Sequence, residues 1–219
     1  MALVKQTGPS PAGTVTLNQN EALQYQFDLL RNWPNQFEVW PLRSGLNILG
    51  IAASAAGIYI NAHYRRKLKL MKIGRAATYL PIIILPGFAA ILGHKLFVTS
   101  DILLEKKECP LCLQTRAAVM QFTIGFLYPM TLGSVGSILL ANRYVTYRLP
   151  DITTDFRSMI SVLTKFTRPI YLQLSIIAIG QVFTVLFLTE LETKSYYKVT
   201  QQLMKAEKAY DEARRDRQK

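Results

Sequence analysis

The chain has 219 residues, half of them hydrophobic, and a formal net charge of +12. Its charged residues gather at the ends and in the connections, which leaves several long uncharged segments and favours a membrane protein over a soluble domain. The basic residues flank these apolar segments and form no aromatic-interleaved patch, so we expect no nucleic-acid binding. Two cysteines are too few for a disulfide framework.

Residues 1–43 are expected to form a polar arm. The first 13 residues lack the apolar segment of a signal peptide, so we expect any organelle address to be internal. Asn18 and Glu21 have the spacing of a capping box and predict a short amphipathic helix. That helix packs either on the rest of the protein or in the membrane interface. Trp33-Pro34 and Trp40-Pro41 are expected to end any helix in the arm.

Four segments are uncharged and long enough to cross a bilayer core of about 30 Å as helices. They are residues 44–62, 76–93, 117–140 and 169–189. The predicted fold class is all-α. It is a polytopic membrane protein, a bundle of four transmembrane helices with an N-terminal arm and a charged C-terminal helix at residues 190–219.

Small residues and prolines predict how the first two spans pack. Two pairs of small residues in the first span predict a face that another helix can approach closely: Gly50 with Ser54, and Ala53 with Gly57. Pro81 and Pro86 predict a kink or a local break in the second span. Neighbouring helices must then cover the freed carbonyl groups, which favours a bundle.

Four spans place both termini and the loop 94–116 on one side of the membrane. The loops 63–75 and 142–168 share the other side and have the clearer excess of basic residues. By the positive-inside rule, these two basic loops face the compartment in which the protein is retained.

Both cysteines lie in one C-P-L-C motif, Cys109 and Cys112, directly before the third span. A zinc site would need His63 and His94 as further ligands, and the expected spans place His63 across the membrane. A redox site is chemically feasible, because a helix start and nearby basic residues favour thiolate. Membrane oxidoreductases that pass electrons from thiols to quinone carry a similar pair, but they need a second pair that this chain lacks. The remaining alternatives are a structural disulfide and two free thiols.

Polar residues in or near the spans have structural explanations. Arg116 is expected to reach the headgroups or to pair with Glu105 or Glu108. Gln121 and Gln181 are expected to form interhelical hydrogen bonds. We find no catalytic constellation and expect no enzyme activity, cofactor or metal. A solute carrier is disfavoured because the spans contain no paired charges.

Ordered motifs point to a family. They are Asn61 with Arg65-Arg66 and Leu68, Arg75-Ala76, Leu80-Pro81, Leu85-Pro86, Cys109-x-x-Cys112-x-x-Thr115-Arg116, Gly125-x-Leu127-Tyr128-Pro129, Arg143-Tyr144, Leu149-Pro150 and Arg168-Pro169. In this order and spacing the chain resembles the transmembrane protein 126 family of mitochondrial inner-membrane proteins, over about residues 45 to 190.

The resemblance implies assembly and not catalysis. Members of the family act as assembly factors for respiratory complex I (NADH:ubiquinone oxidoreductase) and hold membrane-arm subunits until these join. One branch works with soluble partners, including the ECSIT adaptor and an acyl-CoA dehydrogenase-like protein, and the other is tied to the distal membrane arm. The implied partners are therefore complex I membrane-arm subunits, assembly intermediates, other assembly factors and the lipid bilayer.

The implied location is the mitochondrial inner membrane, with several spans. In that membrane the basic loops would face the matrix and the cysteine loop the intermembrane space. The alternative function is a membrane thiol-disulfide oxidoreductase that uses Cys109 and Cys112 with a quinone.

Overall fold

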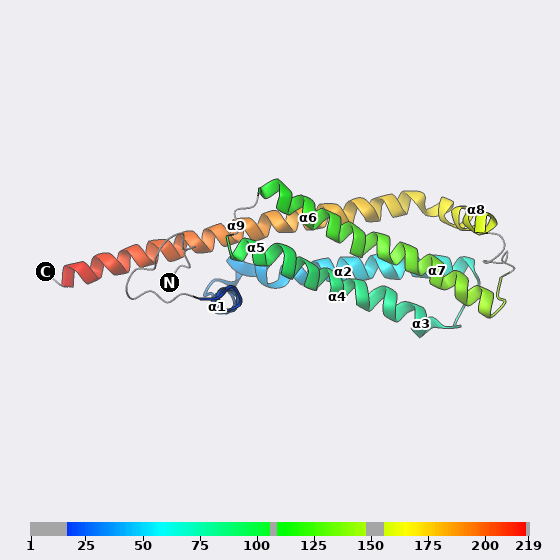
Figure 1. Ribbon diagram of the computed structural model, residues 1–219, viewed down its shortest axis with the longest axis horizontal. Coiled ribbons are helices and arrows are strands. Elements are labelled where there is room, and N and C mark those ends of the chain that lie inside the picture. Colours follow the sequence, from blue (N-terminus) through cyan, green and yellow to red (C-terminus); the bar gives the residue numbers. More distant parts are fainter. Residues whose placement is uncertain (1–16, 106–108, 148–155, 218–219) are drawn as a thin grey trace.

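The computed structural model describes residues 17–105, 109–147 and 156–217, and all regular structure in them is helical. Four helical stretches are long and apolar enough to cross a membrane: Gln36–Lys67, Arg75–Leu103, Pro110–Arg143 and Arg157–Arg217. They lie side by side in an elongated bundle (Figure 1), which confirms the predicted fold class. The first 13 residues, Glu108 and the Leu149-Pro150 motif lie outside the described residues.

Helix α1 (Gln19–Arg31) begins at the predicted capping box, which is confirmed. The Asn18 side chain accepts a hydrogen bond from the Gln19 backbone N–H at 2.7 Å, and the Asn18 N–H donates to the Glu21 carboxylate at 2.9 Å. Leu30 is buried in a core cluster formed with residues of α2, α5 and α9. Of the two alternatives for this helix, the structure therefore favours packing on the bundle.

Helix α2 (Gln36–Lys67) continues through Trp40-Pro41, so the prediction that this dipeptide ends a helix is wrong. Pro41 removes one hydrogen bond, the one its N–H would donate to the carbonyl group of Phe37. Trp33-Pro34 does separate α1 from α2, as predicted.

The second span has the predicted irregularity at its prolines. It consists of α3 (Arg75–Tyr79), a π-helical segment (Leu80–Ile84), α4 (Leu85–His94), a second π-helical segment (Lys95–Thr99) and α5 (Ser100–Leu103). Pro81 lies in the first π-helical segment, and Pro86 lies at the start of α4. Helix therefore extends ten residues beyond the expected end of this span, through a region expected to be a loop.

The predicted small-residue face of α2 packs against this irregular region and is confirmed. A Cβ atom added to Gly57 would overlap the Ile82 carbonyl oxygen, and one added to Gly50 would lie 2.9 Å from the Gly87 oxygen. The Ser54 hydroxyl donates to the Ile83 carbonyl oxygen at 3.0 Å. The two backbones thus meet where the prolines leave carbonyl groups without helical partners.

The third and fourth spans complete the bundle around α2. Helices α6 (Pro110–Phe122) and α7 (Tyr128–Arg143) are joined by a π-helical segment, Thr123–Leu127. Helix α9 (Tyr171–Arg217) continues from the fourth span into the C-terminal helix without a break. Helix α2 contacts α4, α7 and α9, and α6 packs against α9.

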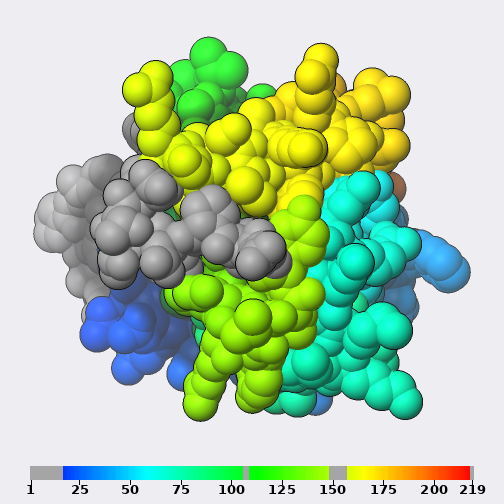
Figure 2. Space-filling model, turned by 90° about the vertical axis from the view of Figure 1, so that its right-hand side faces the viewer, coloured from blue at the N-terminus to red at the C-terminus, as the bar shows by residue number. Residues whose placement is uncertain are grey.

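Helix α8 (Phe156–Thr167) lies in the region expected to be a basic loop, so that part of the expectation is wrong. Its residues Met159, Val162, Leu163 and Phe166 share one face and pack against the ends of α2 and α7. The helix lies across the end of the bundle, seen nearly end-on in Figure 1 and from the side in Figure 2.

Helix α1, the outer part of α9 and the start of α6 with Cys109 lie at one end of the bundle, which we call the cysteine end (Figure 1). The opposite end, which we call the basic end, comprises residues 62–79, 139–147 and 156–171 (Figure 2). This arrangement agrees with the predicted grouping of the loops.

Candidate functional site

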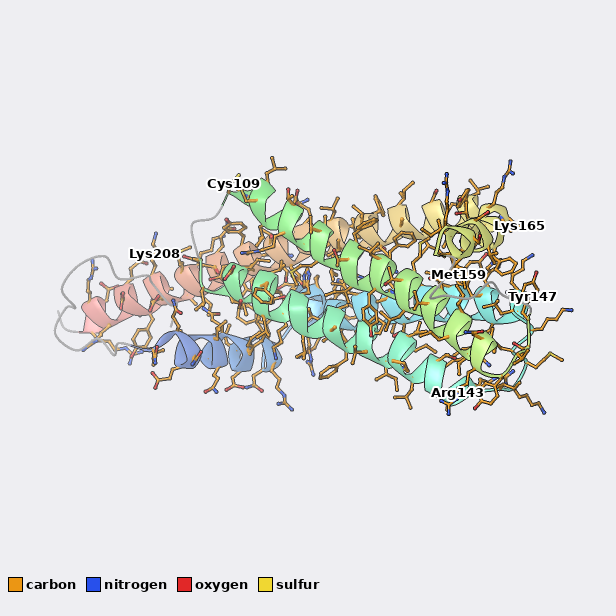
Figure 3. All side chains as sticks on the ribbon, turned by 45° about the vertical axis from the view of Figure 1, so that its right-hand side comes forward. Cys109, Arg143, Tyr147, Met159, Lys165 and Lys208 are labelled. Atoms are coloured by element: carbon orange, nitrogen blue, oxygen red, sulfur yellow. The ribbon has the colours of Figure 1, made fainter. Side chains whose placement is uncertain are left out.

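The two cysteines lie at the start of α6, on the outside of the cysteine end (Figure 3). The Cys109 carbonyl oxygen accepts hydrogen bonds from the N–H groups of Cys112 and Leu113, at 2.9 and 3.2 Å, so Cys109 caps the helix. The backbone N–H of Cys112, its thiol and the backbone N–H of Leu111 lower the pKa of the Cys109 thiol. At neutral pH a larger fraction of this exposed thiol is therefore thiolate.

The structure places no disulfide between the two cysteines, and a bridge between them stays a prediction. Neither of the two histidines that a zinc site would need lies beside the cysteines. His63 Nε2 lies 3.0 Å from the Phe166 carbonyl oxygen at the basic end, and His94 pairs with Glu192. In the described part of the chain, no three metal-binding side chains come together.

Arg116 lies two turns inside α6 and forms an ion pair with Asp101 of α5. The sequence offered Glu105 and Glu108 as partners. The Glu105 carboxylate accepts a hydrogen bond from the Tyr196 hydroxyl at 3.1 Å, and Glu108 lies outside the described residues. Asp101 was overlooked because residues 94–116 were expected to be a loop, whereas α5 turns this carboxylate toward the bundle. The pair ties α6 to the second span.

A buried pair of titratable side chains lies between α4 and α9. His94 Nε2 lies 3.1 Å from Glu192 Oε2, and the side chains are 4% and 0% exposed. The Thr99 hydroxyl donates to the same carboxylate oxygen at 3.4 Å. Sequence reasoning missed this pair because it assigned Glu192 to a solvated helix. The sequence shows only that His94 and two carboxylates, Glu190 and Glu192, lie near the expected ends of the second and fourth spans, and it does not distinguish between the two carboxylates.

The two glutamines of the spans form the predicted interhelical hydrogen bonds. Gln121 donates to Gln181 Oε1 at 2.7 Å and to the Leu49 carbonyl oxygen at 3.3 Å. Gln181 donates to the Ala52 carbonyl oxygen at 2.8 Å. Their polar groups are used to join α2, α6 and α9 and are not available to a substrate.

Arg65 is buried at the basic end and holds the turn between α2 and α3. Its guanidinium donates to the carbonyl oxygens of Met71, Ile73 and Gly74 and, at 2.8 Å, to the Thr78 hydroxyl. Arg65 is thus a structural residue, although its sequence context suggested an exposed basic loop.

The other motif positions also lie at helix ends or contacts. The Tyr128 hydroxyl donates to the Pro81 carbonyl oxygen at 3.4 Å, and Pro129 is buried at the start of α7. Thr115 bonds within α6, to the Leu111 carbonyl oxygen. Exposed motif positions at the basic end are Arg66, Arg143 and Tyr144, with the Arg143 guanidinium 6.0 Å from the Tyr144 ring centre.

Two apolar grooves flank α9 at the level of the spans. The groove between α2 and α9, of about 430 Å³, is lined by the small residues Ala52, Ala55, Ala56 and Gly180 together with larger side chains such as Tyr59 and Ile176. A Cβ atom added to Gly180 would meet nothing within 4 Å. The groove between α6 and α9, of about 380 Å³, is lined by larger side chains such as Phe122 and Phe183. Both grooves open outward, where lipid or another helix would lie.

The described residues therefore offer surfaces for other molecules more than a reaction centre. Comparison with known proteins is consistent with this. No solved structure matches the chain. The chain is 38% identical over 203 residues to transmembrane protein 126 of Drosophila melanogaster, covering 92% of this chain and 91% of that protein.

More distant relatives match shorter regions. Human transmembrane protein 126A is 30% identical over 136 residues, which is 60% of this chain and 69% of that protein. The mouse protein named complex I assembly factor TMEM126B, mitochondrial, is 32% identical over 109 residues, 48% of this chain and 45% of that protein. The family model described as Transmembrane protein 126 matches residues 20–209. The chain belongs to the transmembrane protein 126 family.

Proposed function

We propose that this protein is a scaffold of the mitochondrial inner membrane that assembles the membrane arm of respiratory complex I, and that it catalyses no reaction. The observation that carries the proposal is its relationship to the mouse protein named as a mitochondrial complex I assembly factor. The membrane arm of complex I consists of hydrophobic subunits, so a protein that holds them before they join must present its binding surfaces within the bilayer.

The bundle has surfaces suited to that task. Transmembrane helices associate through close packing, and small residues allow their backbones to approach. Gly50 and Gly57 are used in this way inside the bundle, against α4 and the π-helical segment before it, respectively. Gly180 has no such partner in the described residues and lies in the groove between α2 and α9. We assign this groove to a transmembrane helix of a complex I subunit.

The charged ends suit soluble partners. The outer part of α9 is almost entirely exposed from Gln201 to Arg217 and extends beyond the bundle (Figure 1). Assembly factors such as the ECSIT adaptor and the acyl-CoA dehydrogenase-like protein would bind such extramembrane segments.

Filling the groove is expected to impair assembly. In cells that lack the protein, we expect membrane-arm intermediates to accumulate and the wild-type chain to restore mature complex I. The variant Gly180→Leu should restore several-fold less, because the leucine occupies the space that a client helix needs. Mature complex I is measured on native gels.

A matched control is Gly136→Leu, since a side chain added at Gly136 of α7 also meets nothing within 4 Å, but lies outside this groove. It should restore complex I fully. If Gly180→Leu and Gly136→Leu restored complex I equally, the groove between α2 and α9 would not be the binding site of a client helix. Cys109→Ser with Cys112→Ser should also restore complex I, and failure of this variant alone would leave both a structural disulfide and the thiol-disulfide oxidoreductase as explanations.

A further inference from the structure

The basic end carries an unbalanced set of exposed cationic side chains. They are Arg66, Lys67, Lys69, Lys72, Arg75, Arg143, Arg157, Lys165 and Arg168. The ranges 62–79, 139–147 and 156–171 contain no aspartate or glutamate, so no carboxylate within them neutralises this charge. The ion pairs found among the described residues lie instead at the cysteine end. The segment 148–155 between these ranges adds Arg148, Asp151 and Asp155, so the cations of the basic end still far outnumber the acids and give it a strong positive field.

The backbone of the α2–α3 turn is anchored by hydrogen bonds from Arg65. Arg65 draws the carbonyl groups of Met71, Ile73 and Gly74 inward. Leu68 and Leu70 of the same turn are fully buried, whereas Lys69 and Lys72 are exposed. The turn is therefore fixed to the bundle by its buried leucines, while its lysines face outward.

Helix α8 is held against the same end of α2 by hydrogen bonds. The Tyr64 hydroxyl lies 2.7 Å from the Thr167 hydroxyl, and His63 contacts the Phe166 carbonyl oxygen. Met159 and Phe166 pack in one cluster with Leu68 and Leu70. Because this apolar face is covered by protein, Arg157 and Lys165 project on the opposite, exposed side (Figure 3 shows Met159 and Lys165).

Exposed aromatic and apolar side chains lie among these cations. Tyr144, Tyr147 and Tyr171 are between 36% and 52% exposed, and Met71 and Val145 are about 80% exposed. Tyrosines at span ends are typical of the lipid–water boundary, and long basic side chains there reach the headgroups. Positive charge beside exposed apolar side chains at the span ends matches the headgroups and acyl chains of a lipid surface.

We propose that the basic end is a binding surface for anionic phospholipids, whose phosphate groups contact the basic side chains of α8 and of the α2–α3 turn while their acyl chains cover the exposed apolar residues. The charge complementarity and the position at the ends of all four spans support this occupant. The surface would fix the depth of the bundle in the membrane and retain anionic lipids around it.

The test uses the full chain in nanodiscs of phosphatidylcholine with about one phosphatidylglycerol in five lipids. Native mass spectrometry counts the lipids retained after transfer to detergent. We expect phosphatidylglycerol to be enriched over its share in the disc. In a variant with Lys69, Lys72, Arg157 and Lys165 each replaced by glutamine, the retained phosphatidylglycerol should fall back to its share in the disc, since each cation near an anionic surface contributes separately.

The matched control replaces four exposed cations on the outer part of α9, namely Lys205, Lys208, Arg214 and Arg215, by glutamine. It removes the same charge and should keep the enrichment. Wild-type protein at about 1 M salt, where screening acts within about 3 Å, should lose it without any substitution. The proposal is overturned if the wild type shows no enrichment, if both variants lose it equally, or if the basic-end variant keeps it.

Discussion

Replacing Gly57 by alanine is expected to destabilise the bundle by about 2–3 kcal/mol, because the added methyl group overlaps the Ile82 carbonyl oxygen. A flexible side chain could move aside, but this neighbour is backbone in a π-helical segment. The overlap is relieved only if α2 and the second span move apart. That movement would also weaken the hydrogen bond from Ser54 to the Ile83 carbonyl. The measurement is the midpoint of unfolding by SDS in mixed micelles.

Gly180→Ala is the control for this substitution. The chemical change is the same, but the new methyl group meets no atom within 4 Å, so the helix gains up to about 1 kcal/mol from the better propensity of alanine. The two variants should therefore shift the midpoint in opposite directions. Equal effects would show that α2 and the second span do not approach as closely as the structure has them.

The His94–Glu192 pair predicts the second large effect. Replacing His94 alone by leucine leaves the fully buried Glu192 carboxylate with only the Thr99 hydroxyl as a partner. Removing one member of a buried hydrogen-bonded pair leaves the other without its partner, which costs about 1–3 kcal/mol, and about 3–5 kcal/mol where the pair is charged. The same SDS unfolding measurement should show a loss of that size for His94→Leu and for Glu192→Leu.

The double variant His94→Leu/Glu192→Leu distinguishes this explanation from loss of packing. Two apolar side chains of similar volume often replace a buried ion pair with little net cost. We therefore expect the double variant to be more stable than either single variant. Additive losses in the double variant would contradict the account, because they would mean that the two side chains act independently.

The parts of the fold that the sequence predicts are those set by local physical constraints. The span positions follow from the absence of charge, and the packing face of α2 follows from small residues four apart. The irregular second span follows from Pro81 and Pro86, which lack the backbone N–H that a regular helix needs. The capping box at Asn18 is likewise local.

The missed features depend on contacts between distant segments. Glu192 is 98 residues from His94, and nothing near it in the sequence indicates that it is buried. Arg65 lies among exposed basic residues and differs from them only in facing the carbonyls of the next turn. Helix α8 was predictable in retrospect, since Met159, Val162, Leu163 and Phe166 have helical spacing. The basic residues around them favoured the interpretation of this segment as a basic loop.

The most direct test of the assembly role is affinity purification of the full chain, tagged at the exposed end of α9, from detergent-solubilised mitochondria. The account predicts that complex I membrane-arm subunits co-purify with it in incomplete complexes, and that fewer do so with Gly180→Leu than with Gly136→Leu. Recovery of the tagged protein without any complex I subunit would contradict the account.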